Sequence, residues 1–464
     1  VAVGRNALAS ITTQGKLTAV GASALGSNTT GAYNTAVGYY SLYTNTTGSD
    51  NTSIGYSTLY NNSTGDRNTA LGRSAANTNT TGARNTAIGY YALNANSTGG
   101  YNTAVGDSAL YSNTTADNNT AVGNSALVSN TTGATNTAVG KDALDANTTG
   151  DSNTAIGMQA LSSSTTASDN TAVGHSALFA NTSGTENTAT GRAALVSNTT
   201  GPNNTALGYF ALYSNTTGNG NTGVGRRALE ANTTNDNSTG IGYQALQNNT
   251  AGGQTAVGAN ALTAQTTGSE NTALGYEALK TANGADADYN TAVGSEALKL
   301  STDGDRNVAV GWRALTNNTT GAKNVAIGIE SLYTATTADN NTAIGRRALY
   351  SSTTGSNVTA VGCNALYTNS TGAQNTAVGM QAMELNTTGG QNTALGEGAL
   401  KANTTASNNT AVGQEALTAN TDGADNTAVG KAALDANTTG DNNVALGKSA
   451  LSANTTGHRN TAVG

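Results

Sequence analysis

One pattern of apolar and polar positions, five residues long, recurs along the whole chain. In the segment from Asn34 to Gly38 it reads Asn-Thr-Ala-Val-Gly. The motif occurs 28 times, and 25 of the 27 intervals between its glycines are 17 residues long, with one of 16 and one of 19. Such a strict period indicates that one structural unit is stacked on itself many times.

The apolar positions of each repeat predict short extended segments. Seventeen residues with two glycine-bearing breaks leave no room for an ordinary helix, and β-branched residues cluster between the breaks. We therefore expect each repeat to form one coil of two short strands and two turns. Coils stacked about 4.8 Å apart give an all-β fold, a parallel β-solenoid (β-roll) of about 27 coils and on the order of 130 Å long.

Two kinds of glycine are expected in the turns. One closes the five-residue motif, as Gly38, Gly106 and Gly328 do. The other closes the string Asn-Thr-Thr-Gly, as Gly48 and Gly150 do. In this second string we expect Asn and Thr side chains to bond nearby backbone groups and glycine to supply a positive φ.

Three columns of apolar residues define the faces of the coil. Neighbouring residues of a strand point to opposite sides, so the Val or Ile before the motif glycine faces away from the Ala that precedes it. Four residues after the glycine a Leu stands in 25 of the 27 complete repeats, and this column is expected to fill the interior. The Val/Ile column includes Val37, Ile54, Ile88, Val105 and Ile327, and the Leu column includes Leu42, Leu110, Leu229, Leu315 and Leu451.

The first strand is therefore apolar on both faces, which predicts self-association. A single solenoid has to bury only its inward face, so the second face requires another cover. Val replaces Thr at the first strand position in four copies, Val1, Val308, Val325 and Val444, as though the hydroxyl were tolerated rather than needed. We expect a symmetric homotrimer; the alternative is a monomeric roll with Ala on a half-exposed face.

Composition restricts the possible partners of the chain. Of its 464 residues 36% are hydrophobic and 10% charged, yet the apolar residues keep to fixed columns, which favours an ordered solenoid over disorder. The repeat covers residues 1–464, and we expect a single uninterrupted array that is a segment of a longer fibre protein. A net charge of −7 without a basic cluster argues against nucleic acid, and no apolar run reaches the roughly 20 residues needed for membrane insertion.

The motif resembles repeats of known fibrous proteins. Segments 324–328 (Asn-Val-Ala-Ile-Gly), 307–311 and 443–447 are similar to the motif of the YadA-like head of trimeric autotransporter adhesins, and the commoner Asn-Thr-Ala-Val-Gly form resembles repeats of phage tail-fibre shafts. The resemblance implies a left-handed parallel β-roll. It also implies three chains packed about an axis, with the Val and Ile positions in the trimer core. The repeat here is about three residues longer than is common in those heads.

Two sets of side chains suggest a binding surface. The Thr hydroxyls of the Asn-Thr-Thr strings could present a regular array to ice or to a polysaccharide, although Ser164 and Ala335 interrupt the Asn column. Tyr residues cluster near the amino end and could form a strip for sugar binding, but stacking between neighbouring coils accounts for them more simply. The cluster comprises Tyr39, Tyr40, Tyr43, Tyr60, Tyr90 and Tyr91.

Residues suited to catalysis or to metal binding are few. His175 and His458 lie more than 16 repeats apart, and Cys363 has Arg346 one repeat before it but no accompanying base. Acidic residues such as Asp50 and Asp303 occupy variable positions without the alternating Gly and Asp pattern of calcium-binding rolls. We therefore predict no enzyme activity and no catalytic, cofactor-binding or metal site.

Two irregular intervals are the only local landmarks. One residue is missing near 249–253, and segment 281–288 adds two, so small bulges of the outer surface are expected there. Taken together, the sequence predicts an extracellular structural or adhesive fibre shaft on a cell surface or virion. The expected partners are further copies of the chain and, beyond these, a cell-surface glycan or host receptor. The alternatives are an ice- or polysaccharide-binding Thr/Asn ladder and a homopolymeric extracellular filament.

Overall fold

The protein is an all-β parallel β-solenoid of about 27 coils with a repeat of about 17 residues. The computed structural model describes residues 1–13, 15–264, 266–284 and 287–464, and in these ranges no helix is present. The chain forms two compact units, Val1–Asp236 and Asn237–Gly464. The expectation of one uninterrupted array over residues 1–464 stays a prediction.

Each repeat contributes one short strand. The strands of the first unit are β1 (Ala2–Val3), β2 (Thr18–Val20), β3 (Thr35–Val37), β4 (Thr52–Ile54), β5 (Thr69–Leu71), β6 (Thr86–Ile88), β7 (Thr103–Val105), β8 (Thr120–Val122), β9 (Thr137–Val139), β10 (Thr154–Ile156), β11 (Thr171–Val173), β12 (Thr188–Thr190), β13 (Thr205–Leu207) and β14 (Thr222–Val224). Those of the second unit are β15 (Thr239–Ile241), β16 (Thr255–Val257), β17 (Thr272–Leu274), β18 (Thr291–Val293), β19 (Val308–Val310), β20 (Val325–Ile327), β21 (Thr342–Ile344), β22 (Thr359–Val361), β23 (Thr376–Val378), β24 (Thr393–Leu395), β25 (Thr410–Val412), β26 (Thr427–Val429), β27 (Val444–Leu446) and β28 (Thr461–Val463).

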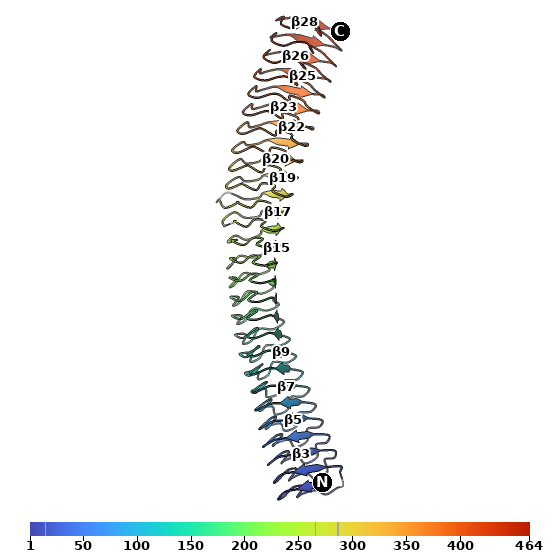
Figure 1. The fold of residues 1–464 in the computed structure, drawn as a ribbon, viewed down its shortest axis with the longest axis vertical. Coiled ribbons are helices and arrows are strands. Elements are labelled where there is room, and N and C mark those ends of the chain that lie inside the picture. The colour runs from blue at the N-terminus through green and yellow to red at the C-terminus, as the bar shows by residue number, and fades with distance from the viewer. Residues whose placement is uncertain (14, 265, 285–286) are drawn as a thin grey trace. The chain divides into compact units, whose positions relative to one another are not determined.

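Within each unit the strands stack in register along the solenoid axis. Strand β3 pairs in parallel with β4, so that Val37 lies beside Ile54 and Ala36 beside Ser53. Figure 1 shows the same stacking for the arrows of β3, β5, β7 and β9 in the first unit. Equivalent residues of successive repeats therefore form continuous columns, as the period predicts.

The interior is filled by the Ala and Leu columns. Ala36 and Leu42 are both fully buried, and so are Leu110, Leu229 and Leu315, which confirms the interior position predicted for the Leu column. Leu451, in the last complete repeat, is half-buried. Each buried Leu is worth roughly 1.5–3 kcal/mol, and the small residue before it leaves space for the facing Ala.

Two columns of Asn also lie inside and bind the coils to one another. Asn34 of the motif donates its Nδ2 to the Gly48 carbonyl at 2.8 Å, and its Oδ1 accepts the Asn51 backbone NH of the next coil at 2.9 Å. Asn45 donates its Nδ2 to the Asn28 Oδ1 of the preceding coil at 2.6 Å and to the Gly48 carbonyl at 2.9 Å. Buried polar groups require such partners, so these ladders hold each coil in place along the axis.

The second half of the repeat is not a strand, so the prediction of two strands per repeat was wrong. The backbone there still bonds from coil to coil, for example from the Leu42 NH to the Thr58 carbonyl at 2.9 Å. However, Tyr40, Leu42 and Asp50 have φ values of 58°, 53° and 57°. Left-handed residues at alternate positions turn the chain around the coil and interrupt the extended geometry that a strand needs.

The two glycine columns serve different purposes. Gly38, Gly106 and Gly328 have φ values of 135°, 139° and 133°, which only glycine adopts readily. Gly48 and Gly150 do not have a positive φ, so that expectation was wrong. Glycine stands there because the coils approach closely: a Cβ on Gly48 would lie 2.5 Å from the Gly65 carbonyl oxygen of the next coil.

The two irregular intervals leave the parallel pairing of the strands intact. After the 16-residue interval, Thr239 of β15 still pairs with Thr255 of β16. After the 19-residue interval, Thr272 of β17 pairs with Thr291 of β18. Residues 285 and 286 of the longer insertion, where a bulge is expected, lie outside the described part of the chain.

Candidate functional site on the outward strand face

The outward face of the strands is a continuous strip of Thr and aliphatic side chains in each unit. We call it the strand strip: it comprises the first and third residues of the strands, as in Thr35 and Val37 of β3. The residue between them, Ala36, points inward and is fully buried. This alternation follows from the two-residue period of an extended chain and agrees with the predicted orientation.

The residues predicted for the trimer core all belong to the strand strip. Val37, Ile88 and Val105 are half-buried on the single chain, whereas Ile54 and Ile327 are 38% exposed. The Leu residues at this position are exposed further, with Leu207 at 48%. In a single chain the aliphatic side chains of the strip are therefore in contact with water. Any partner surface that covers them and excludes water lowers the free energy.

The third strand position of the strip stays aliphatic, whereas the column that follows the motif glycine varies freely. The third strand position is Val, Ile or Leu in every motif except at Thr190. The column that follows the motif glycine holds residues as different as Arg73, Asp107, His175 and Trp312. Both columns are reached by solvent, so burial within a single chain does not explain why only one of them is restricted.

Charges lie beside the strip rather than in it. Glu277 accepts hydrogen bonds from Lys280 at 2.7 Å and from Lys299 at 2.6 Å, and these two bonds lower the pKa of its carboxyl from 4.5 to about 2. Arg313 pairs with Glu296 at 2.8 Å in the same way. The Lys299–Glu277 and Arg313–Glu296 ion pairs each join two successive coils of the second unit.

In the Asn-Thr-Thr strings the Asn and the first Thr bond backbone groups, as the sequence predicts. Asn45 is fully buried, and Thr46 donates its hydroxyl to the Ser63 carbonyl of the next coil at 3.0 Å. The second Thr of the string, Thr47, is exposed. A surface array built from this string would therefore rest on one Thr per coil, because the other two side chains are bonded within the protein.

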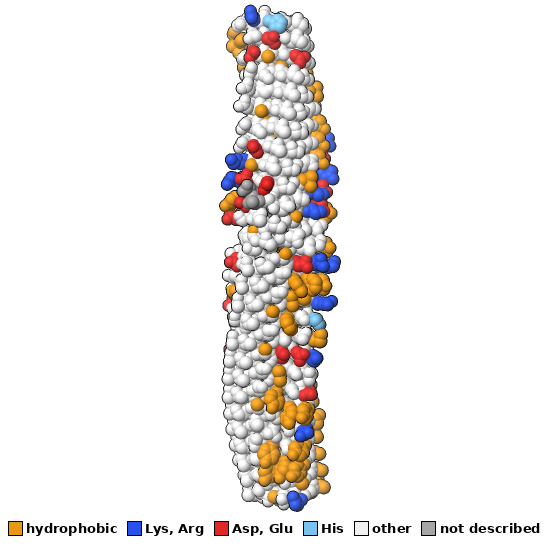
Figure 2. All heavy atoms as spheres, turned by 90° about the vertical axis from the view of Figure 1, so that its left-hand side faces the viewer, with side chains coloured by type: hydrophobic (Ala, Val, Ile, Leu, Met, Phe, Trp, Pro, Cys, Tyr) orange, Lys and Arg blue, Asp and Glu red, His pale blue; other side chains and the backbone are white. Residues whose placement is uncertain are grey.

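Aromatic side chains stack between coils, as predicted for the Tyr cluster. The rings of Tyr43 and Tyr60 are stacked with centroids 5.4 Å apart, and those of Tyr39 and Tyr56 are 5.7 Å apart. Tyr40 meets Tyr39 edge-on at 4.2 Å. Figure 2 shows hydrophobic side chains gathered on the first unit near its amino end.

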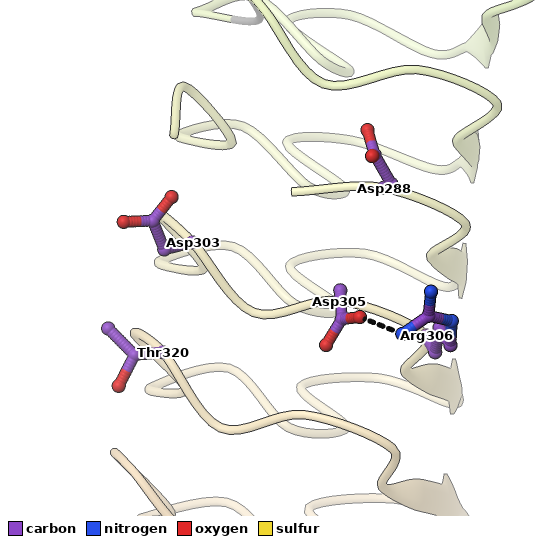
Figure 3. A pocket seen from close by; sticks show the side chains of 5 residues that line it. All are labelled: Asp288, Asp303, Asp305, Arg306 and Thr320. Atoms are coloured by element: carbon purple, nitrogen blue, oxygen red, sulfur yellow. Dashed lines mark hydrogen bonds and ion pairs between the residues drawn. The ribbon is translucent and has the colours of Figure 1, made fainter. Parts of the chain in front are cut away.

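A hollow on the described part of the second unit is lined mainly by acidic side chains. It has a volume of about 520 Å³ and is lined by Asp288, Asp303, Asp305, Arg306 and Thr320. Figure 3 shows Asp305 paired with Arg306, while Asp303 points away from both. Across residues 1–13, 15–264, 266–284 and 287–464, no three His, Cys, Asp or Glu side chains are placed to hold a metal ion.

The remaining candidates for chemistry occupy separate coils. Arg346 donates to the Cys363 Sγ at 3.5 Å, so the structure brings these two predicted neighbours together. His175 contacts Ser176 through Nδ1 at 3.0 Å, and His458 lies 3.3 Å from the carboxylate of Asp441. No helix in the described ranges is long and apolar enough to cross a bilayer.

Two features of the site were not found from the sequence. The Asn columns are buried ladders, and their signal was the near-constant Asn at two positions of a strongly polar chain. The left-handed Leu column had no signal, because Leu rarely adopts positive φ.

In comparisons with known proteins, no family model matches the chain and no curated protein matches it, so its function has to be argued from the geometry above.

Proposed function

We propose that the protein is a structural shaft of an extracellular fibre, on a cell surface or a virion, in which three copies pack through their strand strips. The single observation that carries this proposal is that a column in contact with solvent is restricted to Val, Ile and Leu through both units, with Thr190 as the one exception. In a shaft the side chains need only repeat and cover one another, and a long solenoid supplies a spacer of uniform cross-section.

The interior of one chain supports this assignment because it is already complete. Leu42 and Ala36 leave no inward face uncovered, and the Asn ladders satisfy most of the buried amides, as at Asn34 and Asn45. The strand strip is then the apolar surface that remains, and it has no charged side chain at either of its two positions. Symmetric association of identical strips covers this surface in every copy at once.

The resemblance to trimeric adhesin heads and tail-fibre shafts supports three copies. In those proteins the equivalent Val and Ile positions meet at the trimer axis. Val37, Ile54, Ile88, Val105 and Ile327 occupy these positions here, on the face of the strand opposite the Leu interior. A left-handed coil, extracellular location and binding of a host receptor or cell-surface glycan at another part of the fibre belong to the same proposal.

The test is the mass of the chain in solution. Multi-angle light scattering on the 464-residue chain should give about three times 45.9 kDa. Lysine at two successive strip positions, Val105→Lys with Val122→Lys, should shift the particle towards the monomer. Six ammonium groups would then lie near one apolar axis, and each costs several kcal/mol to desolvate.

A control places two lysines outside the strip; it changes the charge by three units per chain, against two for the strip variant, because one of the replaced residues is Asp. Asp107→Lys with Asn124→Lys alters the variable column of the same coils and should leave the mass unchanged. Far-ultraviolet circular dichroism of both variants should match the original chain, because all four residues point outward. A wild-type chain that remains a 45.9 kDa monomer up to high concentration would refute the proposal.

The ice- or polysaccharide-binding alternative receives less support from the geometry. It relied on the Asn-Thr-Thr strings, in which Asn45 is buried and Thr46 bonds to the neighbouring coil. Thermal hysteresis at high protein concentration is the measurement that would revive it.

A further inference from the structure

One outward column of the first unit stacks Tyr and Arg side chains along the axis. We call it the tyrosine–arginine column: Tyr39, Tyr56, Arg73 and Tyr90, each the residue that follows a motif glycine. The rings of Tyr39 and Tyr56 are 5.7 Å apart and inclined by 23°. These Tyr side chains are 43–51% exposed, so their hydroxyl ends reach solvent.

Arg73 is clamped between two aromatic rings. Its Cζ lies 5.7 Å from the ring centroid of Tyr56 on one side and 5.7 Å from that of Tyr90 on the other. Cation–π contacts of this kind hold a guanidinium in a fixed orientation while its NH edge stays free to donate. Among the described residues, no carboxylate forms an ion pair with Arg73. A hollow of about 350 Å³ lies against Tyr56 and Arg73.

The charge around this column differs from that of the chain as a whole. Residues 1–101 contain five Lys and Arg against two Asp, whereas the whole chain carries a net charge of −7. A second column of the same coils repeats the pairing, since Arg84 lies 4.9 Å from the ring centroid of Tyr101 and Lys16 lies 5.7 Å from that of Tyr33. Figure 2 shows Lys or Arg side chains beside hydrophobic ones in this part of the first unit.

We infer that the tyrosine–arginine column binds a carboxylate-bearing polysaccharide, with one carboxylate on the guanidinium of Arg73. The planar fork of Arg matches the two oxygens of a carboxylate, and pre-orientation by the flanking rings reduces the entropy lost on binding. The Tyr hydroxyls of successive coils form a row of donors and acceptors along the axis, which suits a linear polymer rich in hydroxyl groups. The inference does not depend on the trimer, because all these groups belong to one chain.

The experiment measures binding of the 464-residue chain to polygalacturonate, with neutral dextran as the reference polymer. Affinity electrophoresis at low and at physiological salt should show retardation by polygalacturonate and none by dextran. Arg73→Gln should weaken binding to polygalacturonate about fivefold or more, and Arg73→Lys should weaken it nearly as much, because an ammonium keeps the charge but loses the planar fork.

The matched control is Arg346→Gln. Arg346 occupies the same position in the repeat, but Ile329 and Cys363 flank it instead of Tyr, so its removal should not change binding. Equal binding of Arg73→Lys and the original chain would show that only charge matters and would overturn the inference. The inference would also be overturned if Arg346→Gln lost as much affinity for polygalacturonate as Arg73→Gln, or if dextran retarded the chain as much as polygalacturonate does. A change in mass for Arg73→Gln with unchanged binding would overturn it as well.

Discussion

A gap in one buried Asn ladder gives a sharp prediction about what holds the coils together. Asn147 donates its Nδ2 to the Asn130 Oδ1 at 2.8 Å, but the next repeat carries Ser164 in place of Asn. Ser is too short to continue the ladder, so the Asn147 Oδ1 and the Ser164 Oγ are both buried without a hydrogen-bond partner. After the gap, Asn181 donates its Nδ2 to the Gly184 carbonyl of its own coil. One coil later, Asn198 donates its Nδ2 to the Gly201 carbonyl in the same way and also to the Asn181 Oδ1 of the preceding coil.

Ser164→Asn should close this gap. The introduced amide has the same environment as its column neighbours, and the adjoining Ala167 does not prevent the fit, because Asn113 bonds the carbonyl of Ala116 in the same arrangement at 3.1 Å. Two cross-coil bonds form and one buried oxygen is satisfied. Net hydrogen bonds in proteins contribute about 0.5–1.5 kcal/mol each, so we expect about 2 kcal/mol of added local stability after the cost of ordering the longer side chain.

Amide hydrogen exchange measures this gain where it arises. The Thr165 NH bonds the Thr182 carbonyl at 3.3 Å, compared with 2.8 Å for the Thr148 NH to the Thr165 carbonyl one coil earlier. A gain of about 2 kcal/mol corresponds to roughly 30-fold slower exchange of such amides in the coils around residue 164. Coils of the same unit far from the substitution should exchange as before, since solenoid repeats interact mainly with their neighbours.

The control for the ladder is Ser164→Leu. Leu has the same branch at Cγ and the same number of side-chain heavy atoms as Asn, but it neither donates nor accepts, so it fills space without joining the ladder. If amide exchange around residue 164 slows as much in Ser164→Leu as in Ser164→Asn, then packing rather than hydrogen bonding limits the stability of this coil. No change in exchange for Ser164→Asn would refute the reasoning directly.

Two further predictions concern the motif glycine and the charged ladder. Gly106→Ala should destabilise the protein by about 3–5 kcal/mol, because φ is 139° and a Cβ would also lie 2.4 Å from the Gly123 carbonyl oxygen. A Cβ on Gly133 meets the Gly150 carbonyl oxygen at a similar 2.3 Å, but φ there is not positive and Ala116 and Ala167 occupy the same column, so Gly133→Ala should cost less in the same thermal denaturation. Glu277→Gln should cost about 1–2 kcal/mol at neutral pH. The pKa of Glu277 is lowered from 4.5 to about 2, so the ionised carboxylate stabilises the folded state above pH 4.5, and the difference in stability between the two proteins should vanish as the pH falls from 4.5 towards 2.

The sequence by itself determined the architecture of the coil stack. A strict 17-residue period requires equivalent residues to lie above one another, and the two-residue alternation of Thr35, Ala36 and Val37 assigned the two faces of the strand. The Leu column had to be interior, because a polar chain with so few large apolar residues has to bury those it repeats. These inferences depend only on periodicity and hydrophobicity, which are properties of the sequence.

The tertiary structure alone decided how the chain turns within each coil. Leu42 takes a φ of 53° and Tyr40 one of 58°, against their intrinsic preference, and this removes the second predicted strand. Contacts with the coils above and below impose these angles: the ladder bonds of Asn28, Asn45 and Asn62 recur from coil to coil along the runs of the column that hold Asn. A local preference of about 1–2 kcal/mol per residue is outweighed when the same non-local contacts are repeated on both sides of every coil.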